Sequence, residues 1–205
     1  MSLESVCRAL PFQYGFTGCD TTSSFFNIGK CKWFDYWVNC PEKEQLSSTF
    51  IELSSQPLEI TPSQLNVLEN YILKLYYPSK RNLQSLNIER MNHFSSLPSH
   101  NLRLIPFSRL GLVEHTKRTC LQVGFCWAEA RVNVTIPDPK KWGLKEGTDV
   151  ALIPSWEIRN GEYLTVDDIT FTCGCTVSPC KNCKCVRAGE KCLPFCKCQR
   201  NCDNQ

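Results

Sequence analysis

The sequence predicts an α+β protein with a mainly helical body, a few short strands and an irregular, cysteine-rich tail. Apolar residues recur with helical spacing through most of residues 30–130, whereas the alternation typical of strands is confined to residues 132–166. Nine of the 15 cysteines fall within residues 173–202. A chain of 205 residues forms one or two domains and can bury a modest core. We therefore expect a folded body over residues 1–170, followed by a tail of different character.

The first two predicted helices are short. One covers the aromatic-rich residues 30–39 and stops near Cys40 and Pro41. The other covers residues 44–53, and its apolar positions on one side are Leu46, Phe50 and Leu53. The second helix should pack through this apolar side.

The strongest local signal predicts a helix over residues 62–77. Thr61 is a capping residue, Pro62 takes the first helical position, and Gln64 completes a capping box. One apolar stripe follows, made of Leu65, Leu68, Ile72, Leu75 and Tyr76. Pro78 ends the run.

Helical spacing continues in the second half of the body. A short helix is predicted around residues 87–94, and residues 97–108 should be extended and irregular because Pro98 and Pro106 interrupt them. A longer helix is predicted over residues 109–130, although its glycines weaken the pattern. Its expected buried face consists of Leu110, Val113, Cys120, Leu121, Gly124 and Ala128.

Strands are predicted only after this helix. Residues 132–136, 150–153 and 163–166 alternate as strands do, and the turn-rich residues 137–147 separate the first two. The body should therefore contain only a few short strands.

Most body cysteines and histidines are predicted to have structural roles. We expect buried free thiols at Cys7, Cys19, Cys31, Cys40, Cys120 and Cys126. The histidines are His93, His100 and His115, and none forms a metal-ligand spacing with another histidine or cysteine. They are expected to pack or to lie on the surface.

The tail predicts a structural zinc cluster. Its cysteines are Cys173, Cys175, Cys180, Cys183, Cys185, Cys192, Cys196, Cys198 and Cys202. The gaps between them are short and polar, so coordination by thiolates must replace a core. Nine thiolates supply two four-coordinate zinc ions with one left over, or three ions where three thiolates bridge. A disulfide-knotted tail is the alternative, and the odd count and absent signal peptide argue against it.

The tail resembles the tesmin-type CXC domain and the cysteine-rich region before some SET methyltransferase domains. The matching elements are the Cys173, Cys183 and Cys196 C-x-C pairs and the Arg187-Ala188-Gly189 segment before Cys192. The resemblance implies about three structural Zn²⁺ held by nine cysteines. DNA-binding members carry a tyrosine where this chain has Asn182. Residues 173–205 hold six Lys or Arg and two acids, and three Zn²⁺ with nine thiolates subtract three charges, leaving about +1. A structural role is therefore favoured over DNA binding by the tail.

A second resemblance lies near the start of the chain. Gly18-Cys19-Asp20, followed after six residues by Asn27-Ile28-Gly29, is similar to the G-C-D-x6-G-I-G element of flap-endonuclease and PIN-like nucleases. The resemblance implies that Asp20 ends an acidic cluster holding divalent metals. It also implies that a glycine hairpin grips the DNA backbone through exposed amides. The nucleic-acid-binding candidates are Asn27, Ile28, Gly29, Lys30 and Lys32.

Three further segments are T-G-C-D-T-T-S-S-F-F (17–26), N-I-E-R-M-N-H-F (87–94) and E-H-T-K-R-T-C-L-Q-V-G-F-C-W (114–127). They resemble the C-terminal half of animal proteins, many of which look derived from mobile elements and end in a C-x-C-rich tail. This implies that the sequence is the C-terminal portion of a longer nuclease-like protein. The expected regions are a helix-hairpin-helix-like nuclease remnant at 1–60, a helical body with short strands at 61–172 and the zinc cluster at 173–202.

The acidic cluster of such a nuclease is missing from this stretch. Only 19 residues precede Asp20, and Glu4 is the one acid among them. Two-metal cleavage needs several converging carboxylates. Asp20 is then a relic metal ligand or a helix cap for the T-T-S-S-F-F run that follows.

These observations favour a zinc-binding structural or interaction protein, a catalytically incomplete nuclease-like fragment with nucleic-acid association. One alternative is a DNA-binding factor that uses the hairpin and the tail together. Another is a structure-specific nuclease completed by an upstream acidic half. Expected partners are DNA or a protein, with no membrane and no small-molecule substrate. The net charge of +3 alone does not imply nucleic-acid binding. Without a signal peptide, a nuclear protein is expected, or alternatively a cytoplasmic one, and not a secreted one.

Overall fold

The structure is a computed structural model that describes residues 2–55, 59–96, 102–130, 133–147, 151–155, 158–159, 162–163 and 184–187. It confirms the mainly helical α+β class. The chain divides into two compact units. The first comprises Met1–Asn87 and Pro106–Glu157, and the second comprises Ile88–Ile105 and Ile158–Gln205.

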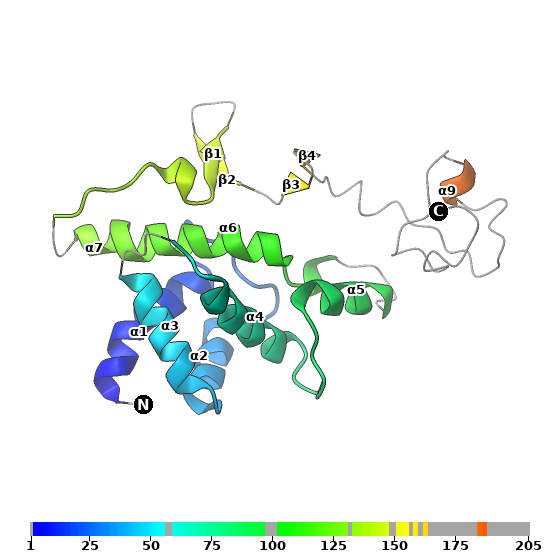
Figure 1. Cartoon of the computed structure of the whole chain (residues 1–205), viewed down its shortest axis with the longest axis horizontal. Coiled ribbons are helices and arrows are strands. Elements are labelled where there is room, and N and C mark those ends of the chain that lie inside the picture. Colours follow the sequence, from blue (N-terminus) through cyan, green and yellow to red (C-terminus); the bar gives the residue numbers. More distant parts are fainter. Residues whose placement is uncertain are drawn as a thin grey trace. The chain divides into compact units, whose positions relative to one another are not determined.

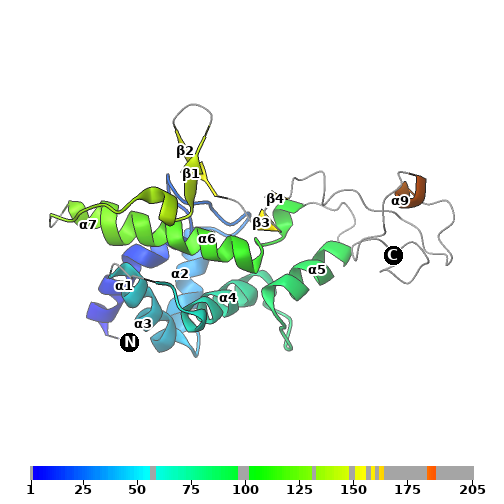
Figure 2. The same cartoon turned by 45° about the horizontal axis from the view of Figure 1, so that its top comes forward.

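The first unit is a helical bundle with one hairpin. Its helices are α1 (Leu3–Phe16), α2 (Lys30–Asn39), α3 (Lys43–Ser54), α4 (Pro62–Tyr76) and α6 (Arg109–Cys120). The π-helical η2 (Leu121–Cys126) and α7 (Trp127–Glu129) extend α6, and the 3-10 turn η3 (Pro139–Lys141) precedes β1 (Leu144–Glu146) and β2 (Leu152–Pro154). In Figures 1 and 2, α1 to α4 lie along one side of the continuous α6–η2–α7 helix, and the hairpin lies on another.

In the second unit, the described elements are few. They are most of α5 (Leu86–Ser96), η1 (Leu102–Leu104), the short strands β3 (Ile158–Arg159) and β4 (Glu162–Tyr163), and α9 (Lys184–Arg187). β3 and β4 pair antiparallel, with Ile158 opposite Tyr163. The predicted strand at 163–166 is described only at Tyr163, which belongs to β4.

The predicted helices at 30–39, 44–53, 62–77, 87–94 and 109–130 are confirmed by α2, α3, α4, α5 and the α6–η2–α7 helix. The capping box of α4 is also confirmed. The Thr61 hydroxyl accepts from the Gln64 amide at 3.2 Å, and the Gln64 side chain accepts from the Thr61 amide at 2.9 Å.

Aromatic side chains dominate the core of the first unit. Phe50 of α3 lies between Phe12 of α1 and Trp37 of α2, with ring centroids 5.5 and 5.4 Å away. Trp33 of α2 meets Tyr71 of α4 at 4.8 Å. These residues belong to one continuous buried cluster that also includes Leu112 of α6. One core therefore extends across residue 60, where the sequence suggested a boundary between regions.

The sequence did not predict the first helix, α1. α1 begins at the Ser2 cap, whose hydroxyl accepts from the Ser5 amide at 3.1 Å, and it contains Pro11. Gly15 allows α1 to approach η2 closely, because a Cβ there would lie 2.8 Å from a Val123 methyl carbon. Its proline and glycine have low helix propensity, so the sequence pattern did not indicate a helix here.

The strand prediction at 132–136 is wrong for its described part, because residues 133–138 form no strand. The alternation there has no partner strand, and a strand forms only with one. The prediction at 150–153 is confirmed in part by β2. Its partner is β1, with Leu144 opposite Pro154. β1 lies within residues 137–147, which were expected to be rich in turns.

Glycine and arginine attach this hairpin to α6. Gly143 has φ +77°, and a Cβ there would lie 2.5 Å from the Glu114 carbonyl oxygen. The buried Arg118 guanidinium donates to the carbonyl oxygens of Gly143 and Ser155, at 3.0 and 3.2 Å. Both ends of the hairpin are therefore bound to one turn of α6.

The expected buried face of this helix needs a correction. Leu110 is exposed, whereas the fully buried positions of α6 include Leu112, Thr116 and Thr119. The threonine hydroxyls donate to the carbonyl oxygens four residues earlier, at 2.7 and 3.0 Å. Because their polar atoms are satisfied within the helix, these residues can face the core.

Candidate functional site

The segment that resembles the nuclease element links α1 to α2. Its first part is a tight turn, in which the Cys19 amide donates to the Thr22 carbonyl at 3.3 Å and the Thr22 amide donates back at 3.2 Å. Asp20 stands exposed at the corner of this turn. The next helix begins only at Lys30 and has Gly29 as its cap. The idea that Asp20 caps a helix over T-T-S-S-F-F is therefore wrong, because that run is not helical.

Asn27 has the left-handed backbone conformation that suits a turn. Its φ is 58°, and the Ile28 amide donates to the Phe25 carbonyl at 3.3 Å across it. Phe25 and Ile28 are buried, so this turn is fixed to the core, while Asn27 and Gly29 remain exposed.

Lys30 serves the fold of α1. Its ammonium donates to the Tyr14 carbonyl at 2.7 Å, to the Gly18 carbonyl, and to the Thr17 hydroxyl at 3.3 Å, and it lies 3.7 Å from the centre of the Tyr14 ring. Burial lowers the pKa of this group. The ammonium thus compensates the carbonyl end of α1, where a positive charge is favourable. Its donors are engaged and do not point to an external phosphate.

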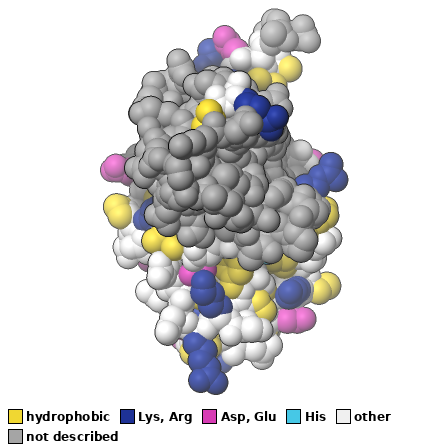
Figure 3. All heavy atoms as spheres, turned by 90° about the vertical axis from the view of Figure 1, so that its right-hand side faces the viewer, with side chains coloured by type: hydrophobic (Ala, Val, Ile, Leu, Met, Phe, Trp, Pro, Cys, Tyr) yellow, Lys and Arg dark blue, Asp and Glu magenta, His cyan; other side chains and the backbone are white. Residues whose placement is uncertain are grey.

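The five candidate residues therefore lie together but differ in role. Ile28 is buried and Lys30 holds α1, whereas Asn27, Gly29 and Lys32 are exposed at the start of α2. The cap at Gly29 makes no side-chain hydrogen bond, and the first turn of α2 contains no acid. This end of α2 can thus present backbone amides to an anion. In Figure 3, single lysine and arginine side chains stand among hydrophobic and acidic ones.

The sequence did not indicate how the Cys19 turn is held. The Thr22 hydroxyl donates to the Gly15 carbonyl at 2.5 Å, and the Thr21 hydroxyl donates to the Gln122 side chain of η2 at 2.6 Å. The Cys19 sulfur lies 3.2 Å from the Thr22 oxygen. Because both hydroxyl protons already have acceptors, the thiol itself is the donor in this contact.

The body cysteines are only partly as expected. All six are free thiols, and Cys40 and Cys120 are buried. Cys7 and Cys31 are exposed, so the expectation of burial is wrong for these two, which lie on the solvent sides of α1 and α2. Cys19 and Cys126 are half-buried.

His115 is a packed core histidine. One ring nitrogen lies 2.8 Å from the Phe16 carbonyl oxygen, and the ring contacts Phe25 and Phe107 at centroid distances of 5.5 and 4.9 Å. Its other ring nitrogen is buried without a hydrogen bond. Burial lowers its pKa to about 4, and Arg118 contributes in the same direction. His115 is therefore neutral at neutral pH.

Of the nine cysteines proposed to bind zinc, eight lie outside the described residues. Cys185 belongs to the four-residue helix α9, and its side chain is completely buried. A buried thiol in a short helix is compatible with a zinc ligand, since a closed zinc site excludes water from its sulfurs. Within the described residues, no group of three or more His, Cys, Asp or Glu could hold a metal ion. Asp20 thus has no acidic partners there.

Comparison with known proteins found no match among family models, curated proteins or solved structures. No helix in the described part of the chain combines the length and the apolar character required to cross a membrane.

Proposed function

We propose that this chain is a zinc-binding interaction protein in which a helical body carries a metal-ordered tail. The tail takes up about three Zn²⁺ through its nine cysteines, and the ions are structural. The body is a catalytically incomplete, nuclease-like unit that associates with nucleic acid or with a protein partner. A reducing compartment, the nucleus or the cytoplasm, keeps the thiolates available for the metal.

The spacing of the nine tail cysteines carries this proposal. C-x-C pairs recur through residues 173–202 with short polar gaps, and this pattern resembles that of the tesmin-type CXC domain. The burial of Cys185 is in keeping with it, because a closed zinc site excludes water from its sulfurs.

Zinc content tests the proposal directly. The full chain, purified in reductant, is expected to retain about three zinc ions per chain by elemental analysis. Cys185→Ser should lower that number. Cys31→Ser is the matched control, since Cys31 is an exposed thiol of α2, and it should retain all the zinc. Fewer than one zinc ion per chain in the unmodified protein would refute the proposal.

Nucleic-acid association is the second candidate function, and the exposed start of α2 favours it. Asn27, Gly29 and Lys32 surround backbone amides that lack a side-chain cap. A labelled branched DNA should bind in a salt-sensitive way, and Lys32→Gln should reduce the salt slope by about one. The control Lys141→Gln changes an exposed lysine of η3 and should leave the slope unchanged.

The same branched DNA separates binding from cleavage. The proposed function predicts binding without Mg²⁺-dependent cleavage. Cleavage that is lost in Asp20→Asn would instead favour the nuclease alternative, in which Asp20 is a metal ligand.

A further inference from the structure

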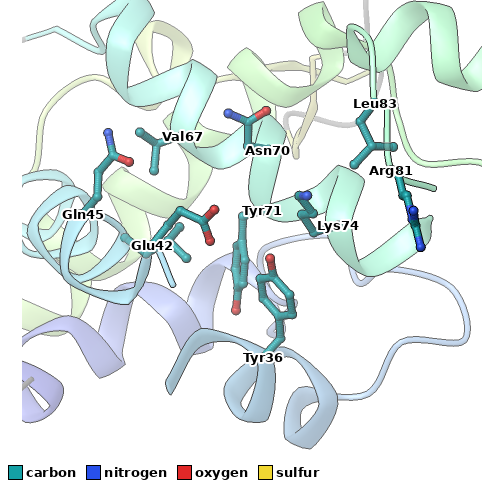
Figure 4. A pocket seen from close by; sticks show the side chains of 10 residues that line it. Tyr36, Glu42, Gln45, Val67, Asn70, Tyr71, Lys74, Arg81 and Leu83 are labelled. Carbon is teal, nitrogen blue, oxygen red and sulfur yellow. The ribbon is translucent and has the colours of Figure 1, made fainter. Parts of the chain in front are cut away.

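A cavity of about 260 Å³ lies in the first unit between α2, α3, α4 and the loop after α4 (Figure 4). We call it the α3–α4 pocket. Its apolar and aromatic lining consists of Tyr36, Leu46, Val67, Tyr71 and Leu83. Its polar lining consists of Glu42, Gln45, Asn70, Lys74 and Arg81. The pocket thus combines an apolar floor with a charged rim.

The floor is held rigidly. Tyr71 is only 2% exposed, and its hydroxyl donates to the Trp33 carbonyl at 2.6 Å. Tyr36 lies beside it, with ring centroids 5.9 Å apart. Leu46 is buried in the core cluster, and Val67 and Leu83 pack against that cluster. A side chain entering here meets fixed aliphatic and aromatic groups, so little ordering is required when it binds.

The rim has a distinct polarity. In Figure 4, Lys74 and Arg81 stand on one side of the pocket, and Glu42 and Gln45 stand on the other. Within the described residues, the side chains of Lys74 and Arg81 make no ion pair or hydrogen bond. These two cations are therefore available to an incoming anion, while the amides of Gln45 and Asn70 can meet a peptide backbone.

The size of the pocket limits its ligand. Pockets for drug-sized molecules span roughly 300–1,000 Å³, and this one is smaller at about 260 Å³. It suits one side chain with its peptide unit. A stacked nucleobase needs an exposed ring face, but the Tyr71 ring is almost fully buried and the Tyr36 ring beside it is half-buried. The floor therefore favours an aliphatic or aromatic side chain of a protein over a base.

We propose that the α3–α4 pocket binds a short acidic, hydrophobic segment of a partner protein. One large apolar side chain lies on the floor, and a neighbouring carboxylate lies between Lys74 and Arg81. This inference goes beyond the proposed zinc function and does not depend on it, because every lining residue belongs to the helical first unit.

Methyl NMR of the full zinc-loaded chain tests this inference. The probe is the blocked peptide acetyl-Asp-Leu-Asp-amide, and the reporters are the methyl groups of Leu46, Val67 and Leu83. Saturable shifts of these signals are expected. The neutral Asn-Leu-Asn peptide should bind about two- to five-fold more weakly for each charge removed, the range of an exposed ion pair.

Three variants locate the charges. Lys74→Gln and Arg81→Gln should each weaken the acidic peptide by about two- to five-fold. Arg8→Gln changes an exposed arginine of α1 that does not line the pocket, and it should bind like the unmodified chain. Because all three side chains are exposed, these variants should fold normally.

Three results would overturn the inference. The first is the absence of methyl shifts with the acidic peptide. The second is equal binding of the basic Lys-Leu-Lys peptide, since that would exclude a role for the two cations. The third is tighter binding of uridine 5′-monophosphate, which would assign the pocket to a nucleotide.

Discussion

The body and the tail of this chain differ sharply in the apolar side chains that they offer for folding. In the body, Trp33, Trp37 and Phe50 are completely buried in one aromatic core. Residues 173–202 offer as large apolar side chains only Val177, Val186, Leu193 and Phe195. So few cannot offset the conformational entropy of ordering 30 residues. We therefore expect the body to fold by burial and the tail to need a metal, and perturbations should separate the two parts.

Zinc removal should have the largest effect, and only on the tail. Structural zinc contributes about 10–16 kcal/mol to the folding of a small thiolate module. A chelator should therefore make the tail sensitive to protease. All five tryptophans lie within residues 33–156, so tryptophan emission should not change. A shift of that emission on chelation would show that the body also depends on zinc, and the comparison would fail.

A cavity in the aromatic core should lower the stability of the body without changing the zinc content of the tail. Phe50→Ala removes the ring between Phe12 and Trp37 and should lower the free energy of unfolding by about 3–5 kcal/mol. Urea unfolding followed by tryptophan emission measures this. Phe26→Ala is the matched control, because Phe26 is 40% exposed, and it should cost less than about 0.5 kcal/mol. A change in zinc content in Phe50→Ala would contradict the independence of the two parts.

Acid should also destabilise the body, through His115. Its pKa is about 4 in the folded protein and close to 6.5 when unfolded. Between these values only the unfolded chain takes up the proton, so the contribution is full above pH 6.5 and is lost as pH falls toward 4. The loss should reach about 3 kcal/mol.

The variant His115→Phe tests the assignment. It should flatten the pH dependence of the urea midpoint between pH 4 and 6.5. His93→Gln is the control. It should keep most of the pH dependence of the urea midpoint, because His93 is only half-buried. An unchanged slope in His115→Phe would mean that another group controls acid stability.

The sequence predicts correctly the elements that local interactions determine, and it fails where residues far apart in the chain must meet. The helix over 62–77 was predictable because its cap, its proline and its stripe are all local. The strand at 132–136 was not, because alternation does not reveal whether a partner exists, and β2 pairs with 144–146 instead. The Leu46–Tyr71 floor of the α3–α4 pocket joins two helices, and only the fold brings such residues together.

The smallest expected effect distinguishes Lys30 from Lys32, which the sequence assigned to the same nucleic-acid-binding role. Lys30 makes its hydrogen bonds 12 to 16 residues back, at the end of α1, whereas Lys32 is exposed. Lys30→Met keeps the aliphatic stem and should lower the free energy of unfolding by about 1–2 kcal/mol, the range for hydrogen bonds to a charged group near a helix end. Lys32→Met should change it by less than about 0.5 kcal/mol.

For DNA affinity we expect the reverse, with a larger loss in Lys32→Met than in Lys30→Met. Lys32 can reach a phosphate, whereas the Lys30 ammonium already has its acceptors. Measuring the urea midpoint and the DNA affinity on both variants therefore separates a lysine that holds the fold from a lysine that can bind a partner. Equal losses of stability would show that the Lys30 contacts contribute nothing. A larger loss of DNA affinity in Lys30→Met than in Lys32→Met, at unchanged stability, would return Lys30 to the nuclease-like role that its sequence position implies.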